Sequence, residues 1–282
     1  MALAAVVPFP VQPGSPVPAP QRARGVGRLT VSQGDGQTRL VEMFQDGSAK
    51  LRLPRVRTGA IEAVLINSGG GMTGGDRFSW TVEVGDGAAA VLTTQACEKV
   101  YRAEAGEARV AARLTVGAGA RLDWLPQETI LFDRSALART IEADVAADGR
   151  LLLAESVVLG RRAMGETLTR AAFHDRWRIR RGGRLLFADD LKLEGDMPAR
   201  TAAAPLLGGA GAFATLLLVA PDAEAPLDAV RAAIGALGGA SAFDGKLICR
   251  LAAPDGRSLR RALLPAIAVL CGGRPAPSVW TL

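Results

Sequence analysis

The stretch ARVAARLTVGAGARLDWL, residues 108–125, shows the repeating unit of the chain most clearly. Residues 108–116 alternate between apolar or small and polar side chains, which is the period of a half-buried β-strand. Gly117-Ala118-Gly119 forms a turn signal, and residues 121–125 resemble a second strand. Three further segments, at 81–94, 140–159 and 173–193, repeat the order strand, glycine turn, strand. The sequence therefore predicts a mainly β protein.

The turn glycines of these four units recur at a nearly constant interval. Gly87, Gly119, Gly149 and Gly183 are 32, 30 and 34 residues apart, and Arg-Leu follows each of the last three turns. Strand repeats of this length can bury their apolar faces by stacking on one another, as in β-solenoids. A sandwich or an antiparallel barrel fits the same periodicity equally well. The repeat predicts layered strands and does not distinguish a solenoid from a sandwich or a barrel.

Segments on either side of the repeat complete the expected fold. Two β-type runs around Gly34-Asp35-Gly36 predict an early hairpin. After about Gly195, apolar residues at helical spacing predict two helices, and we expect their apolar faces to pack in the core rather than to form a docking surface. Residues 201–211 are predicted to be flexible. The expected elements are the hairpin strands 28–33 and 38–44, the late strands 212–219 and 246–252, and the helices 222–237 and 258–270.

Composition limits the class of protein. The chain has 282 residues, of which 49% are hydrophobic and 22% charged, as in globular proteins. Residues 1–24 are predicted to be a disordered Pro-rich tail, and residues 25–282 a single β-rich domain. The tail lacks a basic start, Pro8 and Pro10 interrupt its apolar run, and no segment has the apolar length of a transmembrane helix. Three widely spaced cysteines exclude a disulfide framework and a zinc ribbon. We expect a cytoplasmic protein without a membrane partner.

The net charge of +6 says little about partners. Thirty of the 34 cationic residues are arginines, and they are spread along the chain rather than massed in a block. Aromatic residues make up only 5%, too few to provide stacking platforms between the basic residues. We therefore expect no nucleic-acid partner.

Several kinds of catalytic site are excluded. His174 is the only histidine, and no G-x-S-x-G nucleophile motif is present. A zinc or iron site with several histidines is therefore impossible. Gly69, Gly71 and Gly74 match G-x-G-x-x-G, but the following residues 76–84 alternate as a strand and provide no helix N-terminus for a pyrophosphate.

Polar side chains occur unexpectedly among the apolar strands. Buried charges must be paired or solvated, so these residues indicate either an internal polar network or water-filled passage, or ordinary ion pairs at strand ends. They are Thr94, Gln95, Glu98, Lys99, Tyr101, Arg102, Gln127, Glu128 and Glu166.

The segments that contain these residues resemble the urease accessory protein D family, UreD, also called UreH. The resemblance rests on four motifs in order, and it covers residues 25–200 well and the C-terminal third loosely. The motifs are SGGGMTGGD at 68–76, TTQACEKVYR at 93–102, WLPQETI at 124–130 and GRRAMGE at 160–166.

The resemblance implies a non-enzymatic chaperone of urease maturation. Family members form a complex with accessory protein F and the GTPase accessory protein G, bind nickel-free urease and support nickel insertion. It also implies a right-handed β-helix-like stack of strands with two α-helices in the C-terminal third, and no tightly bound cofactor. The resemblance further implies that nickel passes transiently through an interior channel. Carboxylate and carbonyl oxygens bind nickel more weakly than imidazole or thiolate, which suits such a route. By motif match the acidic residues on this path are Asp76, Glu128 and Glu166, and their polar neighbours are Lys99, Tyr101, Arg102 and Gln127.

Two other functions are compatible with the residues. A β-solenoid enzyme acting on an acidic polysaccharide would use carboxylates and cations along a groove. A purely structural adaptor would need none of the acidic side chains for activity.

Within the second motif, Cys97 and Glu98 depart from many relatives, and we interpret Cys97 as a small core residue rather than a metal contact.

Overall fold

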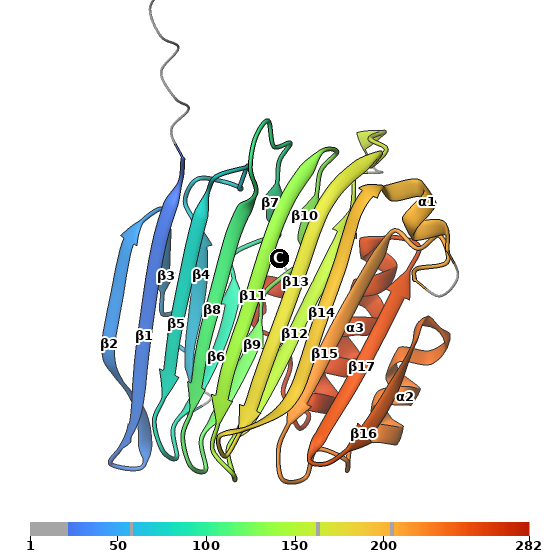
Figure 1. Ribbon diagram of the computed structural model, residues 1–282. Coiled ribbons are helices and arrows are strands. Elements are labelled where there is room, and N and C mark those ends of the chain that lie inside the picture. The colour runs from blue at the N-terminus through green and yellow to red at the C-terminus, as the bar shows by residue number, and fades with distance from the viewer. Residues whose placement is uncertain (1–21, 57–58, 162–163, 204–205, 282) are drawn as a thin grey trace, which may run out of the picture.

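The computed structural model describes residues 22–56, 59–161, 164–203 and 206–281. Two large β-sheets lie face to face, and helices cover the outer side of one of them (Figure 1). Residues 1–21 of the predicted tail lie outside the described residues. In the part of the chain that is described, no helix has the length and apolar character needed to cross a membrane.

The first sheet has seven strands in the order β14-β13-β11-β8-β5-β1-β2. The five strands from β1 to β13 run parallel, and β2 and β14 close the edges as antiparallel neighbours. The bounds are β1 Arg24–Gly34, β2 Gln37–Gly47, β5 Arg77–Val84, β8 Ala108–Val116, β11 Ser135–Val145, β13 Arg170–Arg181 and β14 Arg184–Asp196.

The second sheet has the order β16-β17-β15-β12-β9-β6-β4-β3, and the short strand β10 joins β7 to β12. Strands β4, β6, β9 and β12 are parallel. The bounds are β3 Ala49–Arg52, β4 Ile61–Asn67, β6 Ala89–Thr94, β7 Glu98–Val100, β9 Arg121–Leu125, β10 Thr129–Leu131, β12 Arg150–Leu159, β15 Ala212–Val219, β16 Gly238–Phe243 and β17 Lys246–Ala253.

Successive coils of the chain stack on one another. In three predicted units the glycine turn carries the chain from the first sheet to the second, from β5 to β6, β8 to β9 and β11 to β12. Equivalent residues of successive coils stand side by side: Trp80 aligns with Ala112, Ala112 with Ile141, and Ile141 with Trp177. This is the solenoid-like stack that the family resemblance implies.

The prediction that all four units share one design is wrong for the fourth unit. Strands β13 and β14 form an antiparallel hairpin within the first sheet. Gly182 and Gly183 both have positive φ, at 54° and 78°, which matches the tight primed turns that join antiparallel strands. The predicted early hairpin, β1 with β2, is confirmed and turns at Asp35 and Gly36, which also both have positive φ.

The core consists of two apolar layers. The larger lies between the sheets, and the second lies between the outer face of the second sheet and the helices. The two predicted C-terminal helices are confirmed, and their apolar faces belong to this second layer. A short helix before β15 was not predicted; Asp196 caps it by accepting a hydrogen bond from the Ala199 N–H at 3.0 Å. The helices are α1 Met197–Ala202, α2 Leu227–Ile234 and α3 Gly256–Leu270, with 3₁₀ turns at Gly235–Leu237 and Ser278–Thr281.

Candidate functional site

A small cavity lies inside the stack, between the two sheets. Its volume is about 60 Å³, and Phe78, Trp80 and Trp124 are among the aromatic side chains that line it. A space of this size can hold water where polar partners are present. The polar residues that line it are Thr94, Glu98, Gln127, Thr129, Arg139 and Glu155.

Arg139 is the centre of a buried ionic network at this cavity. Its guanidinium donates to both carboxylate oxygens of Asp175, with Nε–Oδ1 3.0 Å and Nη2–Oδ2 2.6 Å, and to Glu155. The indole N–H of Trp124 donates to Glu155 at 2.9 Å, and that of Trp177 donates to Asp175 at 3.0 Å. All five side chains are buried. One cation therefore faces two carboxyl groups, each of which also accepts an indole hydrogen bond.

The interior raises the pKa of two carboxyl groups toward neutrality. Burial raises the pKa of Glu155 to about 7, although Arg139 opposes the shift. Burial likewise raises the pKa of Glu98 to about 7, against a hydrogen bond from the Asn67 side chain. Burial would lower the pKa of Arg139, but Asp175 and Glu155 raise it above its ordinary value. The cavity thus contains a permanent cation and two carboxyl groups that can change charge near neutral pH.

Breaks in the second sheet bring Gln127 and Glu128 to the helix layer. Pro126 interrupts the strand between β9 and β10, and the Gln127 N–H donates to Thr94 Oγ1 at 2.9 Å instead of continuing the ladder. Arg260 of α3 donates to Glu128 Oε1 at 2.8 Å and to Gln127 Oε1 at 3.0 Å. Burial would raise the pKa of Glu128, but the hydrogen bonds from Arg260 lower it.

Cys97 lies beside this ion pair. Its Sγ donates to Glu128 Oε2 at 3.4 Å. Burial, reinforced by the negative charge of Glu128, raises the pKa of Cys97 to about 11. The thiol is therefore protonated at neutral pH, which is unfavourable for metal binding. The interpretation of Cys97 as a small core residue is wrong, because its side chain is half-buried and contacts Glu128.

Glu166 and Tyr101 belong to a second group near the end of the stack. Arg161 donates to Glu166 from Nε at 3.1 Å and from Nη2 at 3.2 Å, which lowers the pKa of that carboxyl group. Arg161 also stacks on Phe132 at 4.1 Å, and Phe132 packs edge-on against Tyr101 with ring centroids 5.0 Å apart. Tyr101 in turn donates to the carbonyl of Gly70 at 3.0 Å.

Asp76 organises the glycine-rich loop. It is buried, and its Oδ1 and Oδ2 accept the N–H groups of Ala23 and Thr73, each at 2.8 Å. Thr73 Oγ1 donates to the carbonyl of Arg102 at 2.8 Å. The loop needs glycine at Gly71, where φ is +157° and a Cβ would lie 2.3 Å from Tyr101.

Comparison with known proteins identifies the family. The model of the UreD urease accessory protein family matches residues 23–281. Relatives named urease accessory protein UreD include those of Rhizobium leguminosarum bv. viciae, 53% identical over 93% of this chain and 97% of the relative, and Agrobacterium fabrum, 52% identical over 93% and 92%. The relative from Mesorhizobium japonicum is 50% identical over 94% and 96%.

The chain belongs to the UreD family. The match includes the C-terminal third, where the motif resemblance was loose. Arg162 and Ala163 of the fourth motif lie outside the described residues.

Within this UreD-family chain the predicted site residues fall into separate groups. Gln127 and Glu128 meet Arg260, Glu166 and Tyr101 are linked through Arg161 and Phe132, and Asp76 binds backbone N–H groups. Among the residues described, no group of three or more His, Cys, Asp and Glu side chains could hold a metal ion. The prediction that Asp76, Glu128 and Glu166 contact nickel stays a prediction. Lys99 contributes its carbonyl, which accepts the Met72 N–H at 2.8 Å.

Sequence reasoning missed the buried network of Arg139, Glu155 and Asp175. One signal was available, because Glu155 lies within the apolar run LLLAESVVL. Arg139 and Asp175 occupy inward positions of alternating strands, where apolar residues are expected. Arg260 carried no such signal, because a single arginine in an amphipathic helix is ordinary.

Proposed function

We propose that this chain is a scaffold for urease maturation in the cytoplasm. It forms a complex with accessory proteins F and G, binds nickel-free urease and supports nickel insertion into the urease active site. The observation that carries the proposal is the similarity to urease accessory proteins over more than nine-tenths of the chain. The protein has no catalytic step in this scheme; it positions its partners.

The helix layer is the proposed docking surface for accessory protein F. The buried side of α3 packs on the second sheet, whereas Arg257 and Arg261 are exposed. Asp228 of α2 is also exposed. Charge reversal at these three positions should weaken co-purification with accessory protein F, while reversal of Arg39 at the opposite edge of the stack should not. Equal loss in both variants would reject this surface.

The cavity between the sheets supports the proposal of a nickel route. Nickel is cargo here, and carboxylate oxygens hold it weakly enough to release it. Glu98 and Glu155 would provide interior oxygens whose charge changes near neutral pH. Glu128 and Glu166 are already paired with arginines, so nickel at either carboxylate must displace a guanidinium. In this scheme Arg260 and Arg161 pair again with Glu128 and Glu166 after nickel has passed.

Co-expression tests the maturation function. Urease subunits and the remaining accessory proteins are produced with and without this chain, and nickel per active site and co-purification are measured. The proposal expects nickel-free urease when the chain is omitted and a complex with urease when it is present. Normal nickel content without the chain, together with no complex, would refute the maturation function.

Carboxylate variants test the route separately from the scaffold. Glu98→Gln and Glu155→Gln should reduce nickel per active site while the complex still forms, and the exposed Glu83→Gln is the matched control. The same assay applies to the motif-derived residues, as Asp76→Asn, Glu128→Gln and Glu166→Gln. Full nickel loading of urease with all five variants would reject the nickel route and leave the scaffold function standing.

A further inference from the structure

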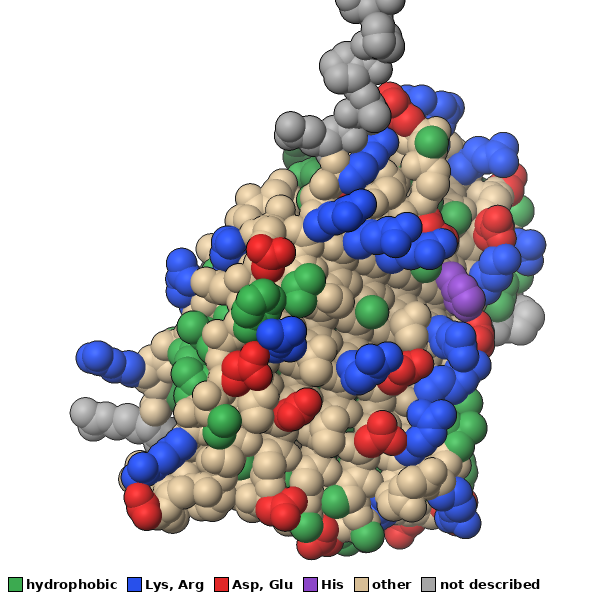
Figure 2. All heavy atoms as spheres, turned by 60° about the vertical axis from the view of Figure 1, so that its left-hand side comes forward, with side chains coloured by type: hydrophobic (Ala, Val, Ile, Leu, Met, Phe, Trp, Pro, Cys, Tyr) green, Lys and Arg blue, Asp and Glu red, His purple; other side chains and the backbone are tan. Residues whose placement is uncertain are grey.

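A row of basic side chains crosses the outer face of the first sheet. In the strand register Arg24 stands beside Arg77, and Arg77 beside Arg109. Neighbouring strands are about 4.8 Å apart, so these three side chains start within two strand spacings of one another. Figure 2 shows Lys and Arg side chains gathered in a band across a face of the molecule. In register order the whole row is Arg24, Arg77, Arg109, Ala138, His174 and Lys192.

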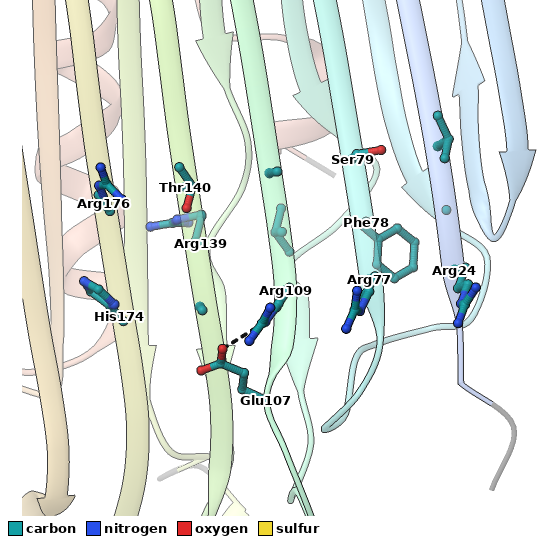
Figure 3. Close-up of a pocket in the computed structure, with 15 residues that line it drawn as sticks. Arg24, Arg77, Phe78, Ser79, Glu107, Arg109, Arg139, Thr140, His174 and Arg176 are labelled. Atoms are coloured by element: carbon teal, nitrogen blue, oxygen red, sulfur yellow. Dashed lines mark hydrogen bonds and ion pairs between the residues drawn. The ribbon is translucent and has the colours of Figure 1, made fainter. Parts of the chain in front are cut away.

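A shallow trough runs along this row. On four of the strands the next outward position is small or short: Val26, Ser79 and Ala111 follow Arg24, Arg77 and Arg109 by two, and Thr140 follows Ala138. The trough has a volume of about 610 Å³, and Arg176 lines it from β13. Figure 3 shows Arg24, Arg77, Arg109, His174 and Arg176 around it. The trough is thus a basic groove that runs across the strands.

Three of the guanidinium groups have no acidic partner within the described part of the chain: those of Arg24, Arg77 and Arg176. The other basic residues in the row have acidic partners. Arg109 binds Glu107 at 3.0 Å, His174 binds Asp190 at 2.5 Å, and Lys192 binds Glu194 at 2.8 Å.

Like charges on neighbouring strands reduce stability. The strand register therefore places Arg24, Arg77 and Arg109 together at a cost that an acidic partner would offset. We propose that the trough binds a carboxylate-rich segment of a partner protein. Arginine suits this role because its planar guanidinium binds carboxylates through two hydrogen bonds.

The chemistry of the face favours a protein over a nucleic acid. Phe78, the one Phe, Tyr or Trp residue that lines the trough, is buried, so the imidazole of His174 is the single exposed ring on which a base could stack. Farther along the same strands the outward positions include the acidic residues Glu83, Glu142 and Asp144. A polyanion that covered both ends of this face would be repelled by these carboxylates, whereas a carboxylate-rich peptide segment can follow the basic row alone.

The test measures binding of labelled poly-L-glutamate to the full chain by fluorescence anisotropy. The row variant is Arg24→Glu, Arg77→Glu and Arg176→Glu together. The control variant, Arg39→Glu, Arg113→Glu and Arg184→Glu, changes the net charge equally at exposed arginines elsewhere in the same sheet. Thermal unfolding checks that the row variant and the control variant are folded. If the row variant with three Arg→Glu changes does not fold, the same three positions are changed to Gln instead.

We expect the row variant to lose about tenfold or more in affinity, and the control to lose clearly less, because specific pairing exceeds the effect of net charge. The affinity of the wild type should fall as salt is raised. Equal losses in both variants, or no loss in the row variant, would overturn the proposal. Tighter, row-dependent binding of labelled polyadenylate would also overturn it and assign the trough to nucleic acid. None of these readouts depends on urease, so they are independent of the maturation function.

Discussion

Replacement of Arg139 by Met is the sharpest test of the interior network. Arg139 is 7% exposed and is the cation that faces Glu155 and Asp175. Methionine has a similar length and fills the space, but it removes the positive charge and all the donors. The substitution leaves two buried carboxyl groups held only by the indoles of Trp124 and Trp177.

The expected cost follows from the charge balance. Removing one partner of a buried ion pair costs about 3–5 kcal/mol, because the remaining charge stays desolvated. The cost must also depend on pH. Without the cation, the pKa of Glu155 in the folded protein, which burial already raises to about 7, rises further above that in the unfolded chain. The folded protein then binds more protons, so its stability falls as pH rises. Each pKa unit corresponds to about 1.4 kcal/mol. Because the pKa of Glu155 is already about 7 in the wild type, the cost at pH 8 should exceed that at pH 5 by up to about this amount.

Urea unfolding at both pH values measures these energies. Fluorescence is a suitable signal, because Trp124 and Trp177 belong to the network. The control is Arg113→Met on β8, where the side chain is 74% exposed and pairs with Glu142 at 3.4 Å. The control should cost under about 1 kcal/mol at either pH. A cost for Arg139→Met below that of the control, or one that does not change with pH, would refute the reasoning.

Three further predictions concern Arg260 of α3, Gly74 of the glycine-rich loop and the thiol of Cys97. Arg260→Ala should destabilise the protein by about 1–3 kcal/mol in urea unfolding at pH 7, because Glu128 loses its charged donor. Gly74→Ala should lower the melting temperature by several degrees, because its Cβ would lie 2.2 Å from the carbonyl oxygen of Ala105, which is backbone and cannot move freely. Cys97 should react slowly with iodoacetamide at pH 8 in the folded protein and rapidly in urea, since its pKa is raised to about 11.

Each of these predictions has a matched control. Arg257→Ala, one turn earlier in α3 and exposed, should change stability by less than about 0.5 kcal/mol. Gly239→Ala places a Cβ where no atom lies within 4 Å, so its melting temperature should stay close to that of the wild type. For the thiols, the urea-unfolded chain is the control. Equal effects in a variant and its control, or fast labelling of Cys97 in the folded chain, would contradict the corresponding argument.

Much of the fold was predictable because its signals are local. The alternation of residues 108–116 and the turn at Gly117-Ala118-Gly119 correspond to β8 and the start of β9. The spacing of apolar residues identified α2 and α3. The fourth repeat unit was misjudged because two consecutive glycines with positive φ turn the chain back into the same sheet. Whether a glycine turn stays within one sheet or crosses to the other depends on its backbone angles, which the residue types of the repeat do not reveal.

The candidate site was predictable only in part. Gln127 and Glu128 stood out because they interrupt an apolar strand, but their partner Arg260 is 132 residues from Glu128 along the chain. Arg139 carried no prediction from the sequence, and its alignment with Asp175 across β11 and β13 brings the two buried side chains together. Pairings over such distances depend on which strands become neighbours.

Most of the helices and strands follow from local patterns: strands from the period of two, turns from glycine, and helices from the period of 3.6. These features are set by interactions between residues a few positions apart. Only the tertiary structure decided which charges enter the core and which arginines meet on the surface. Arg24, Arg77 and Arg109 are dispersed in the sequence and form one row on the sheet. The reason is physical: parallel stacking sets equivalent residues of successive coils side by side, and this register belongs to the assembled sheet rather than to any one strand.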